Sequence, residues 1–342
     1  MKSTIKDVAK EAGVSIATVS RIINKNGSVS SATRKRVEEV IERLNFQPDQ
    51  AARTMVMKVS RYVGLIIPTL SNEYWANLTE VIQRELWTKG YNLMLCIAGE
   101  DKDTLKREKE ILNNLLERKV DGVIYYHAPD KLEGSKKSIL QKYVDSGIPI
   151  VTFEQELPSI SRVSGDHLHG AKDAVQHLIN LGHRNIAFVG VAVGILEREL
   201  GYRNALMLNG INVNEKLIRR TPNSLENGFE ATKDLIESGK RFTAMFCWND
   251  VFAFGAIKAL ESANINVPKD IAVVGYDDNT MASIFKPALT TVRQPIREIG
   301  VNIVELLFET MKNHGSDFHP RNILLQMQLV VRESCGAKLM KD

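Results

Sequence analysis

The residues whose types and spacing could do chemistry form two groups, and the first lies near the N-terminus. Its members form the outward face of a short predicted helix that begins after Ser15: Ile16, Ala17, Thr18, Ser20 and Arg21. An arginine can pair with the O6 and N7 atoms of guanine, while hydroxyl and amide groups bind phosphates. This surface is suited to reading bases rather than to breaking bonds.

The second group consists of polar residues placed around predicted strands. Asp277 follows the apolar run AVVGY, Asn249 follows FCW, and Arg198 opens a predicted helix. Carboxylates, amides and guanidinium groups of this kind hold the neighbouring hydroxyls of sugar-like ligands. An enzyme is the weaker interpretation, because Asp277 and Asp278 are adjacent and would point different ways. The sequence also shows no Ser-His-Asp text, P-loop or Gly-rich dinucleotide fingerprint.

Three short helices are expected to position the first group. Thr4 and Asp7 have the spacing of a helix cap with an acid three residues later, and Ser15 can cap a second helix. A third helix can begin after Ser30 or Ser31. The inward apolar positions are Ile5, Val8, Ala9 and Ala12, then Val19, Ile22 and Ile23, then Val37, Val40, Ile41 and Leu44. This pattern predicts a helix-turn-helix, although its spacing also fits any small helical bundle.

Charge separates the N-terminal region from the rest of the chain. Residues 1–61 hold 12 Lys and Arg against 6 Asp and Glu, whereas the remaining residues hold 33 against 35. The excess positive charge at one end indicates a polyanion partner. The N-terminus lacks the apolar stretch of a signal peptide, which predicts a cytoplasmic protein without a membrane partner. The three cysteines have no metal-ligand spacing, and neither a metal nor a cofactor is expected.

The region after residue 61 alternates apolar strands with amphipathic helices. The expected strands span 62–68, 91–98, 121–126 and 148–153 in one series, and 184–190, 242–248 and 270–276 in a second. Continuous apolar strands alternating with helices are typical of parallel sheets covered on both faces. The prediction is an α/β core of two similar parallel-sheet lobes. A ligand would lie beyond the carboxyl ends of the strands, in a cleft between the lobes.

The run TIKDVAKEAGVSIATVSRIINKNGSVSSATRKRVEEVIERLNFQPDQAAR closely resembles the N-terminal domain of LacI/GalR-type bacterial repressors. The resemblance continues through YVGLIIP, LGHRNIAFVG, VPKDIAVVGYDD and PALTTVRQP. It implies an α-helical helix-turn-helix DNA-binding domain plus a periplasmic-binding-protein-like core. The implied parts are a DNA-binding domain at 1–46, a hinge helix and linker at 47–61, and a core at 62–342. Within the core, the first lobe covers about 62–160 and 292–321, and the second about 163–290 and 323–335.

The resemblance also implies roles for the DNA-binding residues. Ile16, Ala17 and Arg21 match the positions that touch base edges. Thr4, Ser15, Thr18, Ser20 and Asn24 are placed to contact phosphates, although Thr4 and Ser15 could equally serve only as caps. In the hinge, Met55 stands where the family usually has a Leu that wedges between base pairs.

For the effector, the resemblance supports Arg198 and Asp277 most strongly, with Asn249 beside them. Tyr74 and Trp75 match positions that line the pocket from the other lobe, and the alternative is that both belong to the core. Asp250 has a similar alternative, as the cap of a helix beginning at Val251.

This chain departs from the family pattern at two effector positions. Asn223 stands where the family often has an aromatic platform, and Phe153 where it frequently has a polar residue. Trp248 or Trp75 would then have to supply any stacking contact with the ligand. The identity of the ligand therefore cannot be copied from a well-known member.

The function that follows is ligand-gated transcriptional regulation. A homodimer would bind a near-palindromic double-stranded DNA operator, most simply as a repressor. A small-molecule effector, a sugar or sugar derivative, would bind between the lobes and change operator affinity. The alternative is a catabolite-control-type regulator whose DNA binding is set by a protein partner. A secreted sugar-binding protein fits less well, because the chain begins with a basic domain.

Overall fold

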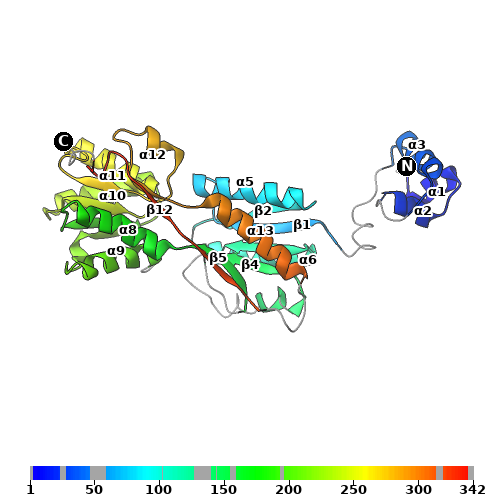
Figure 1. Ribbon diagram of the computed structural model, residues 1–342, viewed down its shortest axis with the longest axis horizontal. Helices are drawn as coiled ribbons and strands as arrows, with labels where there is room; N and C mark the ends of the chain where they lie inside the picture. Colours follow the sequence, from blue (N-terminus) through cyan, green and yellow to red (C-terminus); the bar gives the residue numbers. More distant parts are fainter. Residues whose placement is uncertain are drawn as a thin grey trace. The chain divides into compact units, whose positions relative to one another are not determined.

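The computed structural model describes residues 3–23, 28–46, 59–101, 103–126, 140–143, 145–154, 159–192, 196–312 and 319–337. The chain divides into two compact units, a first unit of residues 1–60 and a second unit of residues 61–342 (Figure 1). Within the described ranges, every helix is too short or too polar to cross a membrane.

The first unit is built from three short helices, as the spacing of its apolar residues predicts. They are α1 (Ile5–Ala12), α2 (Ile16–Ile23) and α3 (Ser31–Arg43). Gly13 ends α1 with a φ of 63°, a left-handed conformation that costs glycine little. The three helices meet at Val8, Val19 and Val37, whose side chains are fully buried.

The first lobe of the second unit is a six-stranded parallel sheet in the order β11-β5-β4-β3-β1-β2. Its strands are β1 (Tyr62–Ile67), β2 (Asn92–Ile97), β3 (Gly122–Tyr126), β4 (Ile150–Phe153), β5 (Ser161–Gly165) and β11 (Asn322–Leu325). Helices α5 (Glu73–Thr88) and α13 (Ile296–Lys312) cover one face, and α6 (Thr104–Glu117) covers the other (Figure 1).

The second lobe is a four-stranded parallel sheet in the order β7-β6-β8-β9. Its strands are β6 (Ile186–Val191), β7 (Ile218–Thr221), β8 (Ala244–Cys247) and β9 (Ala272–Val274). Alternate residues of each strand pack to opposite faces, with Phe246 on one core and Met245 on the other. The first face is covered by α8 (His167–Asn180) and α9 (Glu197–Leu208), and the second by α10 (Leu225–Glu237), α11 (Asp250–Ser262) and α12 (Thr280–Ile284).

The strands show where the chain crosses between the lobes. β5 and β11 both pair within the first-lobe sheet, while β10 (Thr291–Arg293) pairs with β12 (Gln328–Val330) in a separate antiparallel ribbon. The approximate lobe boundaries expected between 160 and 163, 290 and 292, and 321 and 323 stay predictions, and we propose that the chain crosses in the segments after β5, β10 and β11. The sequence SRVSG of β5 mixes polar and apolar residues, so a continuous apolar run does not predict this strand.

Candidate DNA interface and inter-lobe binding site

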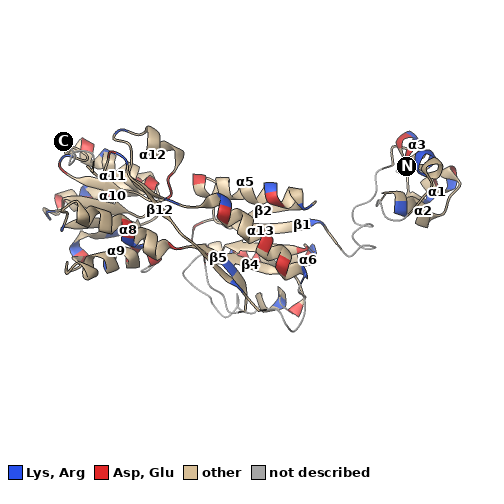
Figure 2. Cartoon of the chain, in the orientation of Figure 1, with Lys and Arg blue, Asp and Glu red and all other residues tan. Residues whose placement is uncertain are grey.

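The outward face of α2 carries the residues expected to read bases. Val19 and Ile22 point into the core of the first unit, with exposed fractions of 0% and 4%. Ile16, Ala17 and Arg21 are exposed on the opposite face. Lys and Arg residues of this unit can be followed in Figure 2. The helix therefore offers one guanidinium and a small apolar patch for contact with a groove.

Two of the expected phosphate contacts also serve as helix caps. The Asp7 carboxylate accepts hydrogen bonds from the Thr4 hydroxyl, at 2.7 Å, and from the Thr4 backbone N–H, at 2.8 Å. These bonds hold the pKa of Asp7 below its usual value. At α2, the Ser15 hydroxyl accepts from the Thr18 N–H at 3.1 Å and shares a 2.9 Å hydrogen bond with the Thr18 hydroxyl. The capping roles of Thr4 and Ser15 are thus confirmed.

The remaining expected contacts of the first unit divide between described and undescribed residues. Ser20 is half-buried on α2. Asn24 and Met55 lie outside the described residues, so their assignments stay predictions.

A buried ion pair lies in the second lobe, at the start of α9 and just after β9. The Arg198 guanidinium is 3.2 Å from Asp277 Oδ1, and the two side chains are 10% and 4% exposed. Arg198 also donates to the Trp248 carbonyl at 2.7 Å and lies over the ring of Tyr276 at 3.9 Å. Gln294 donates to Asp277 Oδ1 at 2.7 Å. Burial raises the pKa of Asp277, and the Arg198 charge opposes that rise.

Asn249 caps α11 and directly follows Trp248, whose carbonyl binds Arg198. Its side-chain oxygen accepts from the Phe252 N–H at 3.0 Å, and its amide donates to the Asn223 side chain at 2.9 Å. The capping role expected of Asp250 is therefore wrong. Asp250 is the first residue of α11, and its carboxylate accepts from the Thr291 hydroxyl and the Asn279 N–H, which fastens the loop after β9.

Tyr74 and Trp75 begin the first-lobe helix α5 and are 6% and 7% exposed. Trp75 packs edge-on against Tyr126, with ring centres 4.5 Å apart, and against Phe153 at 5.4 Å. The core alternative therefore describes the surroundings of Trp75 well. The Tyr74 hydroxyl, by contrast, donates to Glu154 Oε1 at 3.2 Å.

Glu154 and His167 are polar residues of this region that the sequence analysis missed. Glu154 follows β4 with a φ of 69°, and its carboxylate lies 2.5 Å from His167 Nε2. His167 Nδ1 lies 3.1 Å from the Tyr276 hydroxyl in the second lobe. Burial alone would raise the pKa of Glu154, but His167, Arg198 and Tyr74 together outweigh it and the pKa is lowered. The signal for Glu154 was its position after the run IPIVTF, the same rule that selected Asp277.

A second contact joins the lobes at the starts of two helices. The Glu73 carboxylate, in the first turn of α5, accepts from the Thr280 N–H at 3.0 Å and from the Thr280 hydroxyl at 2.5 Å. Thr280 is the first residue of α12. A first-lobe acid thus supplies hydrogen-bond acceptors to a second-lobe helix terminus.

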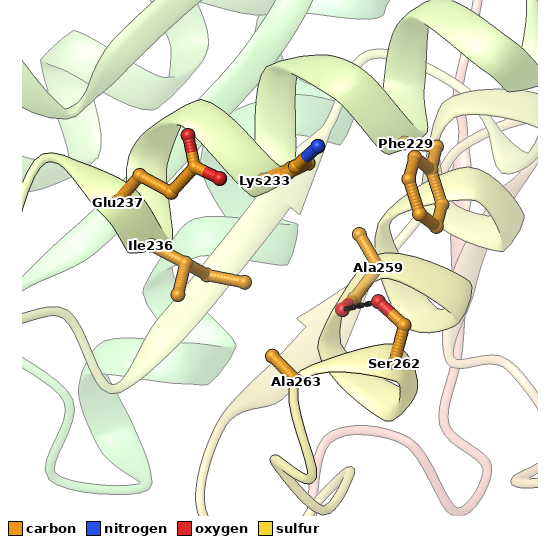
Figure 3. Close-up of a pocket in the computed structure, with 7 residues that line it drawn as sticks. All are labelled: Phe229, Lys233, Ile236, Glu237, Ala259, Ser262 and Ala263. Atoms are coloured by element: carbon orange, nitrogen blue, oxygen red, sulfur yellow. Dashed lines mark hydrogen bonds between the residues drawn. The ribbon is translucent and has the colours of Figure 1, made fainter.

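A surface pocket of about 340 Å³ lies elsewhere, between α10 and α11 of the second lobe (Figure 3). Its lining residues are Phe229, Lys233, Ile236, Glu237, Ala259, Ser262 and Ala263. The expected effector residues all lie outside this lining.

A helix-turn-helix unit joined to a two-lobed core defines a class of DNA-binding regulators, and comparison with known proteins agrees. Residues 4–49 match the family described as bacterial regulatory proteins, lacI family, and residues 175–335 match a periplasmic binding protein-like domain. Catabolite control protein A of Priestia megaterium is 36% identical over 93% of this chain and 95% of its own length. The repressor PurR of Aliivibrio fischeri is 33% identical over 98% and 99%.

Solved structures give the same result. The lac repressor dimer bound to operator and an anti-inducer superposes with a TM-score of 0.87 at 28% identity, covering 98% of this chain and 99% of that one. The regulator CelR in complex with cellobiose gives 0.72 at 28% identity, covering 97% and 100%. The chain belongs to the lacI family of bacterial regulatory proteins, and it is a DNA-binding transcriptional regulator.

Proposed function

We propose that this regulator is a repressor that binds a near-palindromic operator as a homodimer. Two copies of α2 would enter successive major grooves, with Arg21 on a guanine and Ile16 and Ala17 against neighbouring bases. The exposure of these three side chains supports the assignment. The similarity to a repressor dimer on its operator supports the assembly.

The cleft between the lobes is proposed to hold a small hydroxyl-rich effector. The observation that carries this proposal is the buried Arg198–Asp277 pair, with Asn249 beside it and Tyr74 on the facing lobe. Removing an ion pair from water is costly unless further groups form hydrogen bonds with its charged atoms. The hydroxyls of a ligand could form such hydrogen bonds with both charges. The ligand would then lie beyond the strand ends, where parallel-sheet proteins bind ligands.

Closure of the lobes around the effector would link the cleft to the DNA. The Glu73–Thr280 contact supports a closed arrangement, because it can form only when α5 and α12 approach each other. A change in lobe closure would alter the spacing of the two hinge segments in the dimer. The expected coupling is ~1–3 kcal/mol, or about 5–150-fold in operator affinity.

Regulation rather than catalysis is proposed for the acidic residues after β9. Asp277 is tied to Arg198 and Gln294, while Asp278 accepts from Arg293 and Arg332, each at 2.6 Å. Carboxylates held by fixed arginines on different sides are poorly arranged for acid–base chemistry. The polar cleft also favours a small molecule over a protein partner as the controlling ligand.

A thermal-shift screen of the purified protein tests the effector proposal. The panel should contain sugars, polyols, sugar phosphates, uronates and purines. A specific ligand at about 100 times its dissociation constant stabilises the native state by ~2.7 kcal/mol, which gives a visible shift. A hit that loses its effect in an Asp277→Asn variant would support the site. A panel without any hit would contradict the small-effector mechanism and favour control by a protein partner.

A further inference from the structure

We propose that the effector of this regulator presents hydroxyl donors and carries no negative charge. The inference rests on the proposed function and narrows its ligand class. It predicts that the cleft excludes sugar phosphates and uronates while it accepts their neutral parents.

Several carboxylates lie around the proposed ligand site. Glu154 and Asp277 are 12% and 4% exposed, and both lie within electrostatic reach of Arg198. Two further carboxylates act on the same region. Glu197 interacts with His167 and with Glu154, and Glu100 acts together with Glu154 on the Tyr126 hydroxyl. An anionic ligand would enter beside these groups with little water to screen the repulsion.

Two of the basic groups near the proposed ligand site, Arg198 and His167, are already engaged. Arg198 contacts Asp277 and the Trp248 carbonyl, and its guanidinium is stacked on Tyr276. His167 is held by Glu154 on one nitrogen and by Tyr276 on the other. Arg162, on β5, bonds the backbone carbonyl of Glu154 at 3.4 Å. A phosphate that binds Arg198 would therefore have to compete with the buried Asp277 carboxylate, which would be left without its counter-charge.

Hydroxyl donors, in contrast, match what the cleft offers. Gln294 Oε1 is buried and has no hydrogen-bond partner among the described residues, while its Nε2 holds Asp277. A buried acceptor without a donor is costly. A ligand hydroxyl can donate to Gln294 or Asp277 and accept from Arg198. A neutral hydroxyl can therefore bind both the acidic and the basic side chains.

The test compares each neutral sugar with its own charged derivatives. Calorimetric titration would measure the dissociation constants of neutral mono- and disaccharides and polyols, and then of the phosphorylated and uronate derivatives of each binder. The neutral compound should bind roughly 100-fold or more tightly than its anionic derivatives. A phosphate or uronate that binds as tightly as its neutral parent would overturn the charge inference and leave the effector function standing. If nothing in the panel binds to protein that still binds DNA, the proposed effector function fails, and this inference fails with it.

Paired variants separate charge from shape. Glu154→Gln removes one cleft charge at nearly constant volume, so the preference for neutral over anionic ligand should fall at least about tenfold. Glu237→Gln removes the same charge from the exposed surface pocket (Figure 3) and should leave the preference unchanged. Equal effects of the two variants, or no change in either, would show that Glu154 does not set ligand charge. An Arg198→Lys variant that gains affinity for phosphates would also contradict the account.

Discussion

The DNA-reading surface and the proposed inter-lobe site differ in how their residues are positioned and in how deeply they are buried. On α2, the residues proposed to contact bases lie within one eight-residue helix and are exposed. In the cleft, Arg198, Asp277 and Glu154 come from separate strand ends and helix starts and are largely buried. The first surface needs only a correctly packed helix behind it. The second needs two folded lobes and a counter-charge for almost every charged side chain.

This difference predicts different costs of mutation. A change on the α2 surface should alter binding and leave stability almost unchanged, because exposed side chains have few partners. A change in the cleft should alter both, because a buried charge that loses its partner destabilises the fold.

The largest effect is expected for Asp277→Asn in the cleft. The substitution leaves Arg198 buried without its counter-charge, so the free energy of unfolding of the second unit should fall by about 3 kcal/mol. Urea denaturation followed by circular dichroism would measure it. Asp234→Asn is the matched control, because its pair with Arg219 is on the surface, with Asp234 65% exposed. That control should change stability by less than about 1 kcal/mol. Similar losses in the free energy of unfolding of both variants would contradict the claim that the buried pair matters more for stability than the exposed pair.

Arg21→Ala should show the opposite pattern. Operator affinity should fall by ~1–3 kcal/mol and discrimination at one guanine should relax, while thermal stability stays constant. Fluorescence anisotropy on a selected operator and on single-base variants would measure both quantities. Arg241→Ala, an exposed charge on the second lobe, controls for the loss of one positive charge. Unchanged operator discrimination in Arg21→Ala would disprove the assignment of this residue.

Ser30→Ala should weaken the first unit without touching the proposed base contacts. The Ser30 hydroxyl accepts from the Thr33 N–H at 3.2 Å and caps α3, so its loss should cost about 1 kcal/mol. Ser28→Ala, just before the helix, should cost less than about 0.5 kcal/mol. Thermal unfolding of the two variants would measure the difference, and equal stabilities would contradict the capping role.

The smallest expected effect is a loss of stability in mild acid that differs between the two units. Burial lowers the folded-state pKa of His177 and of His183 in the second lobe. The unfolded chain therefore binds more protons below pH 6.5, and these residues lower the stability of the second unit as the pH falls through that value. Residues 1–60 contain no histidine, so the first unit should not share this loss. Hydrogen exchange at pH 7 and pH 5.5 would measure each unit, and a double His177→Asn, His183→Asn variant should reduce the difference.

The same contrast explains how much the sequence could predict. The three helices of the first unit, their caps at Thr4, Ser15 and Ser30, and the inward face of α2 all follow from local spacing. The long apolar strands were equally visible, because a strand buried on both faces is apolar throughout. Each of these features depends on residues within a few positions of one another.

Features that depend on distant residues were harder to predict. The strand β5 contains Arg162 and two serines, and only its pairing with β4 and β11 identifies it. Glu154 was overlooked, although it follows a predicted strand, because its partners His167 and Tyr74 lie far along the chain. The role of Asp250 was misassigned for a similar reason, since its carboxylate binds Thr291 and not its own helix.

Operator binding with and without a bound effector tests the central claim most directly. The operator would first be selected from random DNA, and its dissociation constant then measured by anisotropy with the thermal-shift hit absent and saturating. The account predicts a change of about 5–150-fold in the wild type and little change in Asp277→Asn. Operator affinity that stays the same in the wild type under saturating effector would contradict ligand-gated DNA binding.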